Sequence, residues 1–128
     1  MIDRETELRG LAAGDIFHGR SPNRASLVCL VAAVDDRVIH ARQVTSQDDF
    51  RFDRRTGIEL DGVESWIDCV APFPPDIDNT FREMDRKYRE LSEMTRNGIE
   101  IDHRRIKLTP EEKRALLFID EHVSANPI

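Results

Sequence analysis

The sequence is poor in the residues on which several protein classes depend. It holds 2 cysteines in 128 residues, too few for a disulfide framework, so Cys29 and Cys69 are expected as buried free thiols. The longest apolar run, residues 27–34, is far too short to span a bilayer. The N-terminus lacks the cationic start, apolar centre and cleavage site of a signal peptide. We therefore expect a cytoplasmic protein that does not contact a membrane.

Motifs of nucleotide enzymes and of serine hydrolases are also missing. The 6 glycines form neither a dinucleotide-binding fingerprint nor a phosphate-binding loop, and the three lysines leave little scope for gripping a phosphate. No serine lies in a Gly-x-Ser-x-Gly elbow. These absences favour a protein that is not an enzyme and that holds no cofactor.

Charge is abundant but evenly mixed. Charged residues make up 34% of the chain, with 25 acids, 19 bases and a net charge of −6. Because the two signs are interspersed, no acidic or basic tail stands out, and the acidic balance argues against bulk phosphate binding but leaves room for a local basic face. Apolar residues make up 39%, which in a chain of this length suffices for one core. We expect a single domain over residues 1–128.

The first half of the chain is predicted to be a β-rich, barrel-like core over residues 14–71. Residues 26–34 are predicted to form a central strand buried on both faces, because all of them except Ser26 are apolar. Shorter strands are expected around it, separated by turn residues. This strand density favours a small barrel or bent antiparallel sheet, SH3-like or related. The segment before Gly14 is expected to be a turn, because Gly10 and Gly14 interrupt a helix.

The second half is predicted to be helical, which makes the fold α+β. A stiff connector ends the sheet at Pro72, Pro74 and Pro75. A helix is expected over residues 76–97, capped by Asp76, Asp78 or Asn79 and stopped by Asn97-Gly98.

A second helix is expected over residues 109–125. Thr109 and Glu112 have the spacing of a capping box, and Pro110 suits the first helical position.

The first predicted helix carries a narrow apolar stripe that we call the seam. Its spacing of four, three, four and three resembles the two-in-seven pattern that favours a single neighbouring helix. The seam consists of Ile77, Phe81, Met84, Tyr88 and Leu91. Its neighbour is either the second helix of the same chain, which is slightly favoured, or a helix of another copy or another protein.

An arginine-rich hairpin supplies the candidate binding residues. They are Arg51, Arg54, Arg55 and Thr56. Phe50 and Phe52 alternate with Arg51, so the two rings are expected on the opposite face of the strand, in the core. Buried rings are not free to stack on bases, and nearby acids balance the arginines.

Two histidines and the two cysteines are the candidate metal ligands. His18, Cys29, His40 and Cys69 all lie on predicted strands and could converge on one ion. No close-spaced ligand pair anchors such a site, so no metal is predicted.

These patterns favour a small non-enzymatic binding or regulatory module. It would contact an unidentified protein partner, or a second copy of itself, through its helical half. One alternative is a nucleic-acid accessory protein that uses the arginine-rich hairpin, although nucleic acid is not the expected partner. A further alternative is a metal-binding protein or a small enzyme.

Overall fold

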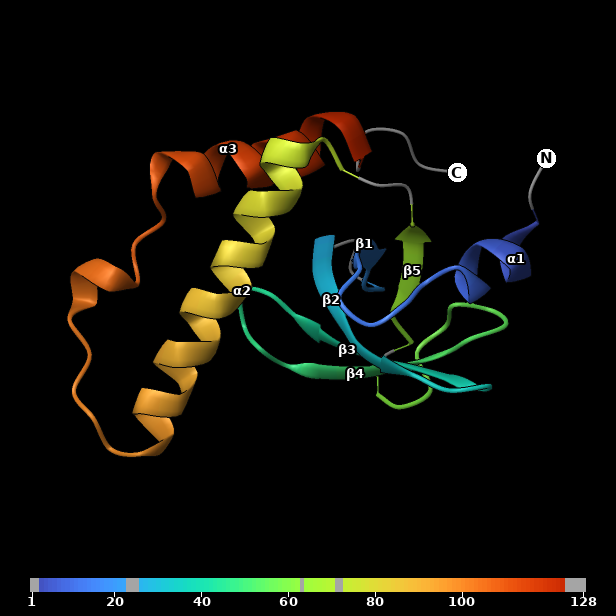
Figure 1. Ribbon diagram of the computed structural model, residues 1–128, viewed down its shortest axis with the longest axis horizontal. Coiled ribbons are helices and arrows are strands. Elements are labelled where there is room, and N and C mark those ends of the chain that lie inside the picture. Colours follow the sequence, from blue (N-terminus) through green and yellow to red (C-terminus); the bar gives the residue numbers. More distant parts are fainter. Residues whose placement is uncertain (1–2, 23–25, 63, 71–72, 124–128) are drawn as a thin grey trace.

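Five antiparallel strands form one curled sheet in the order β4-β3-β2-β1-β5, with helices beside it (Figure 1). The computed structural model describes residues 3–22, 26–62, 64–70 and 73–123. The strands are β1 (Ile16–Arg20), β2 (Ser26–Val34), β3 (Val38–Gln43), β4 (Asp49–Asp53) and β5 (Trp66–Cys69). The α-helices are α1 (Arg4–Arg9), α2 (Pro75–Arg96) and α3 (Pro110–Phe118). Two short turns of other helix types are η1 (His103–Arg105) and η2 (Ile119–Val123).

The two edge strands of the sheet approach each other through the segment that links them. In this segment, Ile58 forms a bridge with Trp66 of β5, and Glu59 forms a bridge with Phe52 of β4. The Asp53 amide donates to the Ile58 carbonyl, and the Ile67 amide donates to the Gly57 carbonyl, each at 2.8 Å. The sheet is therefore a curled half-barrel whose open side is partly bridged by residues 57–59.

The first part of strand β2 is buried on both faces as predicted, whereas Ala32 and Ala33 are exposed. Leu27, Cys29 and Val31 belong to the core inside the curl of the sheet. Val28 is buried on the opposite face, in a second core under the helices. One central strand is thus shared by two cores.

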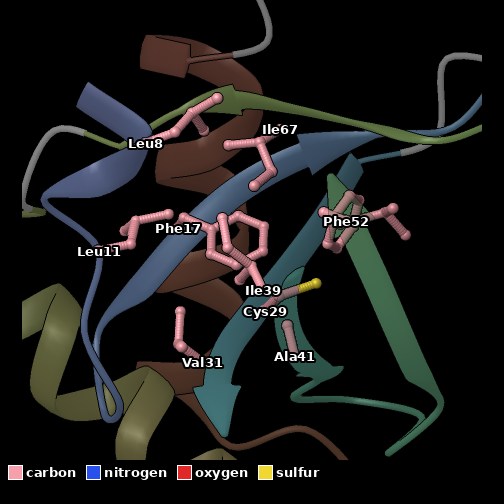
Figure 2. Close-up of a cluster of buried hydrophobic side chains, with 10 residues drawn as sticks. Leu8, Leu11, Phe17, Cys29, Val31, Ile39, Ala41, Phe52 and Ile67 are labelled. Atoms are coloured by element: carbon pink, nitrogen blue, oxygen red, sulfur yellow. The ribbon is translucent and has the colours of Figure 1, made fainter. Parts of the chain in front are cut away.

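The inner core is filled by side chains from every strand and from the N-terminal segment (Figure 2). Phe17 and Phe52 meet edge to face, with ring centroids 5.6 Å apart. Leu8 of α1 and Leu11 just after it close one end of this core, and both are buried. Helix α1 therefore acts as a lid on the curled sheet.

The outer core lies between the sheet and the two long helical segments. Phe81 and Met84 of α2 are fully buried there, together with Ala115 of α3. The helices are joined by Lys87, whose Nζ donates to Glu112 Oε1 at 2.8 Å. Figure 1 shows α3 crossing α2 near the start of α2.

A bidentate ion pair fastens α2 to the sheet. Arg42 of β3 donates from Nε and Nη2 to the two oxygens of Asp85, at 2.9 and 2.8 Å. The Gln47 side chain donates to the same carboxylate at 3.0 Å. Burial opposes the charged form of Asp85, but these hydrogen bonds outweigh it and hold the pKa of that carboxyl below its ordinary value.

Several local expectations are confirmed and two are wrong. The capping box of Thr109 and Glu112 is present, and α2 ends at the expected Asn97-Gly98 stop. The N-terminal segment, however, is a helix rather than a turn, because the Asp3 side chain caps it and Leu8 gains a buried position.

The cap of α2 is also different from the expected one. Pro74 is its N-cap, Pro75 is its first residue, and no side chain caps it. Helix α3 gives way to η2 after Phe118. The predicted end at residue 125 lies outside the described residues, as do residue 71 and Pro72.

Removing the ring of Phe81 is expected to lower the free energy of unfolding by about 3–5 kcal/mol, because a fully buried ring leaves a cavity. Urea unfolding of Phe81→Ala measures this loss. Leu117→Ala is the matched control, since Leu117 is 53% exposed and its loss should stay below about 1 kcal/mol. Equal losses in the two variants would contradict the described packing of α2.

Candidate functional site

The residues of the arginine-rich hairpin form ion pairs and hydrogen bonds within the chain. Arg51 pairs with Asp61, with Nη2 2.6 Å from Oδ2, and both side chains are at least half exposed. Arg54 donates to the backbone carbonyls of Asp35 and Arg9, which links the hairpin to α1. The main-chain amide of Arg55 binds the Asp53 carboxylate at 2.7 Å.

Thr56 and the two rings complete this hairpin. The Thr56 hydroxyl accepts the Ile58 amide, so it shapes the turn. Phe52 is fully buried and stacks on Phe50, with centroids 5.9 Å apart, on the face opposite Arg51 as predicted. The two rings are therefore not placed beside the arginines to stack on a base. A binding role for the hairpin residues remains a prediction.

The seam of α2 lies inside the chain. Ile77, Phe81, Met84 and Leu91 are buried, and Tyr88 is partly buried against the outer core. Helix α2 contacts both α3 and β2 there. This is the arrangement within one chain, which the sequence slightly favours over a helix of another copy or another protein.

The four candidate metal ligands do not lie together. Cys29 lies in the inner core, where burial raises the pKa of its thiol. His40 is partly exposed, with Nε2 3.7 Å from an oxygen of Asp35. His18 and Cys69 sit opposite each other on β1 and β5. Within the described ranges, no group of three or more His, Cys, Asp or Glu side chains is placed to hold a metal ion.

A polar cluster at the β1–β5 pairing escaped the sequence reasoning. His18 pairs with Cys69 and Gly19 with Ile67, so Asp68 is an extra residue in a β-bulge. Asp68 Oδ2 lies 3.2 Å from His18 Nδ1 and accepts from Arg20 Nε at 2.9 Å. The i, i+2 spacing of His18 and Arg20 on one strand was the available signal for a shared partner.

Glycine is required between the two β1 members of this cluster. A Cβ on Gly19 would stand 2.9 Å from the Trp66 carbonyl oxygen, a distance that real Cβ atoms essentially never show. The close backbone approach brings the bulge of β5 within reach of His18 and Arg20.

His18 is fully buried, and its second ring nitrogen, Nε2, has no hydrogen-bond partner among the described residues. Burial lowers the pKa of the imidazole, and the Arg20 charge adds to that effect. The carboxylates of Asp68 and Asp120 act in the opposite direction. The resulting pKa lies below 6.5, so at neutral pH the ring is held uncharged.

Asp68 also borders an open groove of about 1010 Å³ beside β5. The groove runs from α1, past the chain entering β1 and the end of β5, to the first turns of α2. Its apolar lining includes Leu11, Ile16, Val70 and Phe73. Its polar lining includes Glu7, Asp15, Asp78 and Arg82, together with the half-buried thiol of Cys69. We refer to this feature as the β5 groove.

Comparison with known proteins adds no relative. No protein-family model, curated protein or solved structure matches the chain. Within the part of the chain that the structure describes, no helix combines the length and apolar character needed to cross a membrane.

The buried neutral His18 should make stability depend on pH. The unfolded chain binds a proton near pH 6.5, whereas the folded chain resists it, so the free energy of unfolding should fall as pH drops from about 7.5 to 5.5. Urea titrations at several pH values measure this slope. His18→Gln should flatten it and His40→Gln should not; an unchanged slope in His18→Gln would contradict the assignment.

The two thiols should differ in reactivity. Cys69 lines the β5 groove, whereas Cys29 is fully buried with a raised pKa. An aromatic disulfide reagent should therefore titrate one thiol in the native protein and both after denaturation. Cys69→Ser should abolish the native reaction. A native reaction that survives in this variant would show that Cys29, not Cys69, is accessible.

Proposed function

We propose that the protein is a small non-enzymatic binding module that engages a protein partner in the β5 groove. The single observation behind this proposal is the groove itself, which combines an apolar lining with an acidic border at a sheet edge. Its volume is at the upper end of the range of ligand-binding clefts, and its open form suits a polypeptide better than an enclosed small molecule.

The proposal includes a fold of the SH3-like or related barrel type. Strands β1 to β4 form an antiparallel meander, and β5 returns to pair with β1. The bridges made by Ile58 and Glu59 bring the two edges together, which supports a barrel-like description. Such small barrels commonly present binding surfaces between their loops.

The chemistry of the groove favours binding over catalysis. A catalytic thiol needs a neighbouring base, and none of the hydrogen bonds found among the described residues joins Cys69 to a histidine. The Nδ1 of the His18 imidazole is instead hydrogen-bonded to Asp68, and the ring is fully buried. Cys69 therefore serves as a lining residue of the groove.

A protein partner also fits the charges better than a nucleic acid does. The groove lining carries more acids than bases, which repels phosphates. At the hairpin, Arg51 is paired with Asp61 and Arg54 with backbone carbonyls. We further propose a cytoplasmic location, which the free thiols Cys29 and Cys69 support.

Selection from a random peptide library displayed on phage tests this function. We expect peptides that bind the native protein and lose binding once Cys69 carries a bulky maleimide, because the adduct fills the groove. Cys69→Ser treated with the same maleimide is the control and should keep binding. A selection without binders, or binders that tolerate the adduct, would contradict the proposed function.

A further inference from the structure

We propose that the β5 groove takes an extended, basic segment of its partner, which adds to the sheet as a strand beside β5. This inference rests on the proposed function and names the chemistry of the partner. It follows from three properties of the groove: an open sheet edge, an apolar lining and a surplus of carboxylates.

The open edge lies at the end of β5. Strand β5 is the last strand of the sheet. Its Ile67 is already satisfied on the side away from β1, since its amide donates to Gly57 and its carbonyl accepts from Arg4. Residues 68–70 continue along the groove, and no strand of the described chain pairs with them on that side. An unpaired edge is a template for another strand.

The apolar lining of the groove provides places for alternate side chains. Leu11, Ile16 and Phe73 line it and are buried, and Val70 is partly buried. Successive side chains of a strand point to opposite faces. An added strand therefore turns every second residue toward this apolar lining, which favours an apolar residue at those positions. The residues between them point toward the border of the groove.

The border of the groove is acidic. Its charged lining residues are four acids and one base: Glu7, Asp15, Asp68, Asp78 and Arg82. Arg82 is neutralised within the chain, because its Nε donates to Asp78 at 2.6 Å and its Nη1 to the Gly14 carbonyl at 2.6 Å. Asp68 is held by His18 and Arg20.

Two carboxylates of the border are left to attract a partner. The Glu7 side chain makes no hydrogen bond or ion pair among those found in the described residues, and Asp15 accepts one backbone amide, from Ala12. The chain as a whole carries a net charge of −6. Lysine or arginine at the outward positions of the added strand complements this border. The preferred segment therefore alternates apolar and basic residues.

A pair of fluorescent peptides tests the inference directly. The probe is a capped peptide of about six residues that alternates valine with lysine, and its counterpart alternates valine with glutamate. Fluorescence anisotropy should show binding of the lysine peptide alone, with weaker binding in about 0.5 M salt. Methylating the amides along one edge of the lysine peptide should abolish binding, because these amides then cannot pair with β5.

Charge variants locate the binding within the protein. Glu7→Gln combined with Asp15→Asn should weaken the lysine peptide by about tenfold or more, since two attractive charges are lost. Asparagine at position 15 keeps an acceptor for the Ala12 amide. The matched control, Asp36→Asn combined with Asp48→Asn, removes two exposed acids elsewhere and should bind as the unchanged protein does.

Hydrogen exchange supplies a readout that is independent of charge. Bound lysine peptide should slow exchange of the amides in residues 68–70. Equal affinity for the two peptides, tolerance of the methylated amides, or unchanged exchange would each overturn the inference. If the phage selection returns groove-dependent peptides that are acidic or helical, the inference fails and the proposed function stands. If no selected peptide depends on the groove, both fail.

Discussion

The two-sided burial of β2 is the constraint on which the rest of the structure depends. Cys29 and Val31 face the core inside the curled sheet, while Val28 faces the core under α2 and α3. Every element therefore has to cover one of two opposite faces. Helix α1 closes the inner core with Leu8, and α2 covers the outer face with Phe81. Residues 27–31 of β2 pack into these two cores, whereas Ala32 and Ala33 further along the strand are exposed.

Polar side chains hold the layers in place. Arg42 pairs with Asp85 and joins α2 to the sheet, and Lys87 pairs with Glu112 and joins α3 to α2. In the edge strand β5, the bulge turns Asp68 toward His18, and a side chain at position 19 would collide with the Trp66 carbonyl oxygen of that strand. The β5 groove lies beside this bulge, so the geometry of the candidate site follows from how β5 ends against β1.

Much of the local structure could be predicted because its causes lie within a few residues. The capping box of Thr109 and Glu112 acts over one helical turn, and the apolar run of β2 predicts the two-sided burial seen over residues 27–31. The N-terminal helix could not be predicted, because what stabilises it is distant in the sequence. Leu8 is buried only when the curled sheet has formed the core into which it packs. The groove was missed for the same reason, since Glu7, Asp15 and Val70 meet only after folding.

The sequence by itself determined an α+β chain, with strands before the proline connector and capped helices after it. It also determined which face of the hairpin carries Phe52 and which carries Arg51. Only the tertiary structure decided that the seam of α2 would be covered by its own chain and that Asp68 would join His18. Periodicity and capping are properties of neighbouring residues, whereas these contacts depend on how a bulge and a curl bring distant segments together.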